Sequence, residues 1–168
     1  MRGEEKPQPQ RWLGRHPVAP IGFGAMRLTG PGVFGPPADR REALLLLKEV
    51  VDSGVNHIDT AQYYGPGVVN QLIREALYPY PAELVLVSKV GARRDDRGGI
   101  LAYDEPAQLR NGIEENLKAL GVDSLPVVNL RLMRAGGPDS FLRRPARRHD
   151  RRSRRRAHRR SRAQQRHP

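Results

Sequence analysis

The chain of 168 residues is long enough for one domain with a hydrophobic core, and it contains no cysteine, which excludes disulfides and thiolate metal sites. Its N-terminus lacks the apolar stretch of a secretory signal, and no apolar run approaches the ~20 residues that a membrane helix needs. We therefore expect a cytoplasmic protein with no membrane partner. His16 and His57 are isolated from other possible ligands, so no metal site is expected.

The formal net charge of +12 lies entirely at one end of the chain. Residues 1–133 hold 16 basic and 16 acidic residues, whereas residues 134–168 hold 14 arginines and two aspartates. After Leu142 this last segment has no Leu, Ile, Val, Met or aromatic residue, so it lacks the apolar surface that offsets chain entropy. We predict a polar N-terminal segment at 1–17, a folded domain over 18–133 and a disordered Arg-rich tail over 134–168.

Strand and helix signals alternate within the predicted domain. Short apolar stretches predict four strands, at about 20–24, 55–59, 83–89 and 125–133. Helical spacing predicts three helices between them, over 39–54, 68–77 and 105–121. Asp39 and Glu42 have capping-box spacing at the first helix, and Pro106 suits the first turn of the third. We expect the apolar side of the third helix to consist of Leu109, Ile113, Leu117 and Leu120. The order βαβαβαβ indicates an α/β fold with a parallel sheet, either doubly wound or the opening of a (β/α)8 barrel.

Three consecutive predicted strands deliver polar residues at or near their ends. Asp59 closes the second strand, Lys89 closes the third, and Asn129 and Arg131 interrupt the fourth. Each of these has a structural explanation on its own, as a turn former or a solvated charge. In a (β/α)8 barrel, however, the C-terminal ends of the strands converge on the face where active sites are built. Together they favour a site at that face.

The residues around these positions resemble the aldo-keto reductase superfamily. The resemblance is carried by GVNHIDTAQYYG, VVNQLIREAL and LVLVSKVG, in which an Asp, a Tyr five residues later and a Lys at the end of the next strand follow in order. The flanking GFGAMRLTGPGVFGPP and VVNLRLM are similar to the bacterial branch that includes pyridoxal reductase-like oxidoreductases. The match runs from about Val18 to Met133. It implies the first half of a (β/α)8 TIM barrel, since a complete barrel takes ~250 residues.

The resemblance implies that the protein reduces an aldehyde or ketone with NADPH as the cofactor. Pyridoxal-like compounds are among the substrates that the resemblance suggests. Tyr64 matches the general acid of the superfamily, and Tyr63 is the alternative phenol, one residue short of the family spacing. A free phenol ionises only near pH ~10, so its acidity must be raised for work at neutral pH. The positive charge of Lys89 would favour loss of the phenol proton, and Asp59 would hold Lys89 charged and in place.

The resemblance also implies roles for Asn129 and for the segment from Gly24 to Met26. Asn129 stands where the superfamily usually has a histidine; its amide can donate a hydrogen bond to a carbonyl but cannot titrate. A structural hydrogen bond in the barrel interior is the alternative role for Asn129. Gly24, Ala25 and Met26 match a segment that lines the nicotinamide end of the cofactor site. They do not form a dinucleotide loop, because Arg27 stands where the third glycine of GxGxxG belongs.

The Arg-rich tail has two competing explanations. Its composition is what a GC-rich coding sequence yields when it is read out of frame, which predicts a truncated and impaired reductase that lacks the second half of the barrel. Alternatively, it is a genuine basic arm that would bind nucleic acid non-specifically and with strong salt dependence. The absence of aromatic residues after Phe141 weakens this alternative, because none is available to stack on bases. A third possibility is that the front half serves as a non-catalytic interaction module.

Overall fold

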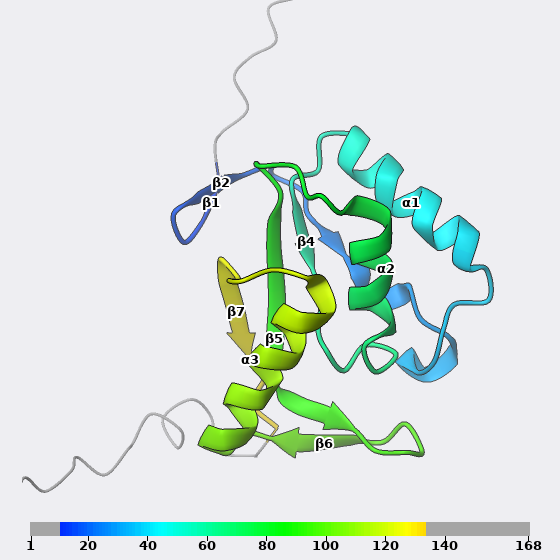
Figure 1. The fold of residues 1–168 in the computed structure, drawn as a ribbon, viewed down its shortest axis with the longest axis vertical. Coiled ribbons are helices and arrows are strands. Elements are labelled where there is room, and N and C mark those ends of the chain that lie inside the picture. The colour runs from blue at the N-terminus through cyan, green and yellow to red at the C-terminus, as the bar shows by residue number, and fades with distance from the viewer. Residues whose placement is uncertain (1–10, 134–168) are drawn as a thin grey trace, which may run out of the picture. The chain divides into compact units, whose positions relative to one another are not determined.

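The computed structural model describes residues 11–133, and the predictions for residues 1–10 and 134–168 lie outside the described residues. Four parallel strands organise this part of the chain (Figure 1). They are β3 (Phe23–Gly24), β4 (His57–Asp59), β5 (Val85–Arg94) and β7 (Val127–Leu130). Each of the last three pairs with the parallel strand that precedes it along the chain. A doubly wound sheet reverses its strand order at a switch point, so the sequential order is that of a (β/α)8 barrel.

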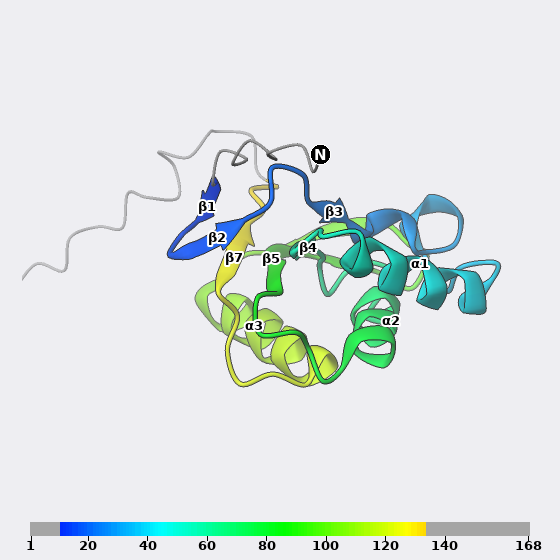
Figure 2. The same ribbon diagram turned by 90° about the horizontal axis from the view of Figure 1, so that it is seen from above.

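The helices confirm this choice because they lie on one side of the sheet, as Figure 2 shows. They are α1 (Arg40–Asp52), α2 (Val68–Leu77) and α3 (Pro106–Leu120). A doubly wound fold would carry helices on both faces. Two short 3-10 helices, η1 (Ala25–Arg27) and η2 (Pro31–Val33), follow β3. Among the described residues, no helix is long and apolar enough to cross a membrane.

Local capping explains where α1 begins and where α3 begins and ends. The Asp39 side chain accepts a hydrogen bond of 2.9 Å from the backbone N–H of Glu42, as the spacing predicts. A reciprocal capping box also starts α3, where the backbone N–H of Glu105 donates to Gln108 Oε1 at 3.1 Å. Gly121 ends α3 with a φ of 71°, a left-handed conformation that glycine adopts at little cost.

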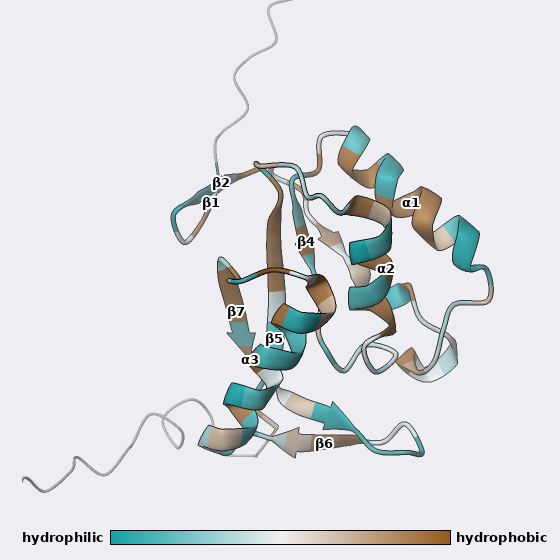
Figure 3. Ribbon diagram, viewed as in Figure 1, coloured by the Kyte–Doolittle hydropathy of each residue, from teal (hydrophilic) through white to brown (hydrophobic). Residues whose placement is uncertain are grey.

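The two faces of the sheet bury different apolar clusters. Ile58 and Leu86 belong to the large core beneath the helices. Val85 and Val87, which point to the other face, pack instead with Val18. Figure 3 shows β5 changing from apolar at its start to more polar toward its C-terminal end. The sheet is therefore packed on both faces over the first three residues of β5, and polar side chains begin at Ser88.

Two antiparallel hairpins were not anticipated from the sequence. β1 (Arg11–Leu13) pairs with β2 (His16–Val18) around Gly14, so regular structure begins at Arg11, within the segment expected to be only a polar extension. β5 continues beyond the predicted end of its strand and pairs with β6 (Ile100–Tyr103). The stretch DDRGG between these two strands has the composition of a turn. In the structure Asp95 closes this turn by accepting a hydrogen bond from the backbone N–H of Gly99 at 2.7 Å.

The buried side of α3 also differs from the expected one. Gly112, Asn116 and Leu120 are its buried residues, whereas the side chain of Ile113 is 37% exposed. Leu120 was expected on the apolar side, but Ile113 was wrongly placed there. The helix packs Gly112 and the Asn116 amide toward the sheet because Asn70 and Ser88 form hydrogen bonds with this amide in the interior.

Tyr80 joins the segment after α2 to the end of α3. Its hydroxyl donates a hydrogen bond of 2.6 Å to the carbonyl oxygen of Leu120. Burial raises the pKa of Tyr80 to about 12, and the positive charge of Arg74 opposes this increase only in part. The folded state therefore holds the phenol proton more tightly than the unfolded chain does, since a free tyrosine ionises near pH ~10.

We predict that Tyr80→Phe lowers the free energy of unfolding at neutral pH by about 0.5–1.5 kcal/mol through the lost hydrogen bond. The raised pKa contributes stability that is present below pH ~10 and is lost as the pH rises through about 12. The variant should therefore lose less stability than the parent over this alkaline range. Urea unfolding at a series of pH values measures both effects, with Tyr78→Phe, whose ring is 58% exposed, as the control. Equal alkaline losses in Tyr80→Phe and the parent would contradict the prediction.

Candidate active site

An ion pair between the end of β4 and the middle of β5 forms the centre of the candidate site. Asp59 ends β4 and pairs in register with Val87, two residues before Lys89 on β5. Asp59 and Lys89 therefore project to the same face of the sheet, since side chains alternate along a strand. The ammonium of Lys89 forms a salt bridge with the Asp59 carboxylate and donates a second hydrogen bond, of 3.2 Å, to the carbonyl oxygen of Thr60. The structure thus brings together the two charges that the sequence placed at successive strand ends.

Opposing effects act on the charge of Lys89. Burial lowers its pKa, but hydrogen bonding to Asp59 and Tyr64, together with the charges of these groups, outweighs burial and leaves the pKa raised. Only 20% of the lysine side chain and 38% of the aspartate side chain are exposed. Lys89 is therefore a partly desolvated ammonium that stays charged at neutral pH, beside a tyrosine hydroxyl.

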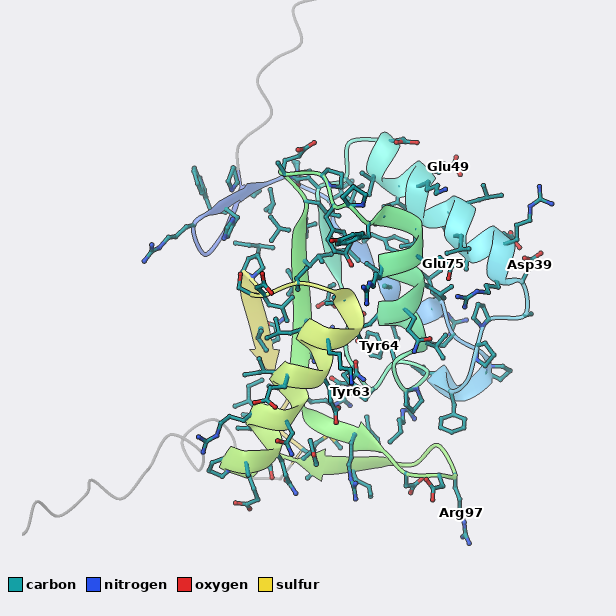
Figure 4. The ribbon with its side chains drawn as sticks, in the orientation of Figure 1. Asp39, Glu49, Tyr63, Tyr64, Glu75 and Arg97 are labelled. Atoms are coloured by element: carbon teal, nitrogen blue, oxygen red, sulfur yellow. The ribbon has the colours of Figure 1, made fainter. Side chains whose placement is uncertain are left out.

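The two tyrosines lie in the loop between β4 and α2, where Figure 4 shows them next to each other. Their rings meet edge to face with centroids 5.4 Å apart, and both side chains are buried. Lys89 Nζ lies 5.0 Å from the ring centroid of Tyr64. Tyr63 instead has the guanidinium of Arg131 5.9 Å from its ring centroid, and burial raises its pKa. The geometry therefore associates Tyr64, more than Tyr63, with the ion pair.

Asn129 lies beside the ion pair on the neighbouring strand. The register of β5 and β7 places it directly opposite Lys89. Its side chain is exposed and, among the described residues, has no hydrogen-bond partner. The structural hydrogen bond considered from the sequence is therefore not formed within the described part of the chain, and the amide is accessible from outside.

β3, the other neighbour of β4, has an unobstructed backbone position at Gly24. Gly24 on β3 is paired in register with Asp59, and a Cβ atom added at Gly24 would meet no heavy atom within 4 Å. A flat group could therefore approach the strand at this point without obstruction. Of the two residues that follow, Met26 is 41% exposed, whereas Ala25 is fully buried in the core and could contact a ligand only through its backbone.

A cavity of about 220 Å³ opens on the other side of Lys89. It is lined by the loop after β4, by β5 from Lys89 onward, by the end of β6 and by the middle of α3, including Gln62, Tyr63, Arg93, Tyr103 and Glu115. These lining residues were not expected from the sequence, because the third strand was predicted to end at Lys89. Recognition of the DDRGG turn as a hairpin signal would have revealed them.

The described residues thus form the first half of an α/β barrel, with an aspartate, a lysine and a tyrosine gathered at the C-terminal ends of its strands. Residues 20–131 match the model of the Aldo/keto reductase family. The chain belongs to this family.

Curated relatives match a similar stretch of the chain. The pyridoxine 4-dehydrogenase of Escherichia coli is 53% identical over 125 residues, which cover 74% of this chain and 44% of that protein. An uncharacterized oxidoreductase of Schizosaccharomyces pombe is 37% identical over 110 residues, covering 66% of this chain and 36% of the relative. The chain therefore spans less than half the length of these two relatives.

Solved structures show the same fold. An aldo-keto reductase from Bacillus halodurans in its holo form is similar with a TM-score of 0.61 and 28% identity, over 72% of this chain and 39% of that one. An aldo-keto reductase from Klebsiella pneumoniae, solved in complex with NADPH, is similar with a TM-score of 0.51 and 25% identity. This second match covers 68% of the present chain and 36% of the other.

We predict that Asp59→Asn lowers the pKa of Lys89. The substitution removes the carboxylate charge but leaves the lysine buried, and burial disfavours the ammonium form. The sequence holds only four lysines, so carbon-labelled lysine signals can be assigned by substitution and titrated one by one by NMR; they are Lys6, Lys48, Lys89 and Lys118.

The matched control is Glu75→Gln. It also removes a carboxylate from an ion pair, but that pair joins Glu75 to Arg40 between the exposed sides of α1 and α2. The control should leave the Lys89 titration where it is in the parent. If Asp59→Asn also left it unchanged, the ion pair would not control the charge of Lys89.

Proposed function

We propose that this protein is an NADPH-dependent reductase that converts an aldehyde or ketone to an alcohol, with Tyr64 as the proton donor. The observation that carries the proposal is the cluster of Asp59, Lys89 and Tyr64 at the C-terminal ends of parallel strands. Active sites of (β/α)8 barrels lie at this face. Membership of the aldo/keto reductase family supports the reaction class.

Each residue of the cluster has a distinct task. Bound NADPH would supply the hydride that reaches the carbonyl carbon. As the carbonyl oxygen gains negative charge, the Tyr64 hydroxyl donates its proton to that oxygen. The ammonium of Lys89 stabilises the phenolate that remains, and Asp59 fixes the position of the ammonium. Asn129, opposite Lys89 on β7, can donate a hydrogen bond from its amide to the same carbonyl oxygen.

The open backbone at Gly24 fits a planar cofactor ring. A nicotinamide placed there would lie next to Asp59 and within the sector that contains Lys89 and Tyr64. Gly24 and Met26 would contact it directly, and Ala25 would do so through its backbone alone. The structural similarity to a reductase solved with NADPH supports this choice of cofactor.

A pyridoxal-type aldehyde is the substrate we propose. The support is the 53% identity to a pyridoxine 4-dehydrogenase, whose name states that it acts on an alcohol of this class. We propose in addition that the 168-residue chain is impaired by itself, since β3 and β7 are unclosed edges in the described part of the chain.

The test uses a chimera in which residues 11–133 replace the corresponding part of the E. coli relative. This chimera should reduce pyridoxal with NADPH, and the 168-residue chain should show little or no turnover in the same assay. An inactive chimera that folds and binds NADPH would count against the proposed reaction. Steady turnover by the 168-residue chain would contradict the proposed impairment.

In the active chimera, we predict that Tyr64→Phe lowers kcat by about 10²–10⁴-fold, the usual range for loss of a general acid. NADPH affinity, measured by fluorescence titration, should change little because only a hydroxyl is removed. Tyr63→Phe is the matched control and should retain most of the activity. The opposite result, in which Tyr63→Phe is inactive and Tyr64→Phe active, would reverse the assignment of the proton donor.

A further inference from the structure

A chain of buried polar side chains lies behind the candidate site, between the sheet and the helices. It consists of Thr60, Asn70, Ser88 and Asn116, none of which has any exposed surface. The Thr60 hydroxyl donates to Asn70 Oδ1 at 2.7 Å, and Asn70 Nδ2 donates to Asn116 Oδ1 at 2.9 Å. The Ser88 hydroxyl donates to the same Asn116 oxygen at 2.5 Å. We call these four residues the buried polar network.

The network is anchored on the two helices that cover the ends of β4 and β5. Asn70 belongs to the first turn of α2, and Asn116 lies on the buried side of α3. Asn116 Nδ2 also donates to the carbonyl oxygen of Gly112 at 2.6 Å, which fixes the orientation of its amide. The network therefore ties two strands to two helices through side chains that have defined donors and acceptors.

Each strand residue of the network adjoins one member of the ion pair. Thr60 directly follows Asp59, and Ser88 directly precedes Lys89. Because side chains alternate along a strand, the two hydroxyls point toward the helices while the two charged groups point to the opposite face. The carbonyl oxygen of Thr60 accepts a hydrogen bond from Lys89, so the peptide fixed by the Thr60 hydroxyl also contacts the ammonium.

The loop that carries the tyrosines is held by the same network. Asn70 Nδ2 donates a further hydrogen bond, of 3.0 Å, to Gln62 Oε1, two residues before Tyr64. The carbonyl oxygen of Gln62 in turn accepts a hydrogen bond of 2.7 Å from the backbone N–H of Gly67, which closes the loop. Asn70 thus connects the peptide after Asp59, the tyrosine loop and, through Asn116, the residue before Lys89.

Packing alone does not account for these four residues. Apolar side chains of similar volume could fill the same space, and replacing buried polar groups by well-packed apolar ones is often neutral or stabilising. A fully satisfied polar network adds a defined geometry, because its directional bonds form in only one arrangement. Here that arrangement sets the positions of the backbone on either side of the site.

We infer that Thr60, Asn70, Ser88 and Asn116 are positioning residues, which hold the Asp59–Lys89 pair and the Tyr64 loop in the geometry that carbonyl reduction requires. They act through the backbone and touch neither substrate nor cofactor. The inference rests on the proposed function for its link to catalysis, but the geometry of the ion pair can be measured without any turnover.

The first experiment compares Thr60→Val with Thr60→Ser in the 168-residue chain. Valine keeps the shape of threonine and removes the hydroxyl, whereas serine keeps the hydroxyl. NMR titration of labelled lysine should show a lower pKa for Lys89 in Thr60→Val and the parent value in Thr60→Ser. Lys48 and Lys118, which lie outside the site, report any general change of the fold and should not shift.

An unchanged Lys89 titration in folded Thr60→Val, even with reduced resistance to urea, would overturn the inference, because the network would then support packing only. Ser88→Ala provides a second variant if Thr60→Val does not fold, and it should likewise lower the pKa of Lys89. An unchanged Lys89 titration in Ser88→Ala would overturn the inference in that case.

The second experiment measures kinetics in the chimera. Thr60→Val should lower kcat by about tenfold to a hundredfold, the effect of a small misplacement of reacting groups, with little change in KM. Thr60→Ser should restore most of kcat. Equal loss in both variants would overturn the positioning role. If the chimera has no reductase activity while Lys89 still responds to Thr60→Val, the proposed function fails but the positioning of the ion pair stands.

Discussion

The parallel pairing of β4 with β5 fixes where the charged residues of the candidate site lie. Its register places Asp59 opposite Val87, so Lys89 projects beside the carboxylate at the same edge of the sheet. A slip of one residue would turn Lys89 into the core and Ser88 toward the site. The hydrophobic packing of Ile58 and Leu86 beneath the helices opposes such a slip. Packing of the core therefore fixes the register that places Asp59 and Lys89 side by side.

Much of this arrangement could be predicted because it depends on local sequence signals. The bounds predicted for α2 are those of the structure, and Asp39 caps α1 as its spacing indicates. The position of Asp59 at the end of β4 followed from an apolar run that stops at a charge, whereas Lys89, predicted to end its strand by the same reasoning, lies in the middle of β5. The choice of a barrel over a doubly wound sheet, which the structure confirms, came from the resemblance to a known family, since strand order is a long-range property that periodicity does not encode.

The features that were missed have two causes. The hairpin of β5 and β6 carries a local turn signal, DDRGG, but the strand was predicted to end before it, at Lys89. The buried side of α3 contains the polar residue Asn116, which the pattern of apolar residues does not place there, because its partners lie on other elements. Asn116 is acceptable in the interior only because Asn70 and Ser88 satisfy it, and these partners lie 46 and 28 residues away along the chain. No local window of sequence contains both members of such a bond.

The hairpin of β1 and β2 covers the start of β5 but not the rest of the strand. Val18 packs against Val85 and Val87, so the start of the strand is covered on the face from which Lys89 projects farther along. Substitutions of these valines are expected to change the stability of the fold, whereas substitutions of Lys89 are expected to act first on the ion pair of the candidate site. The hairpin thus divides one face of a single strand into a part that serves folding and a part that carries the candidate site.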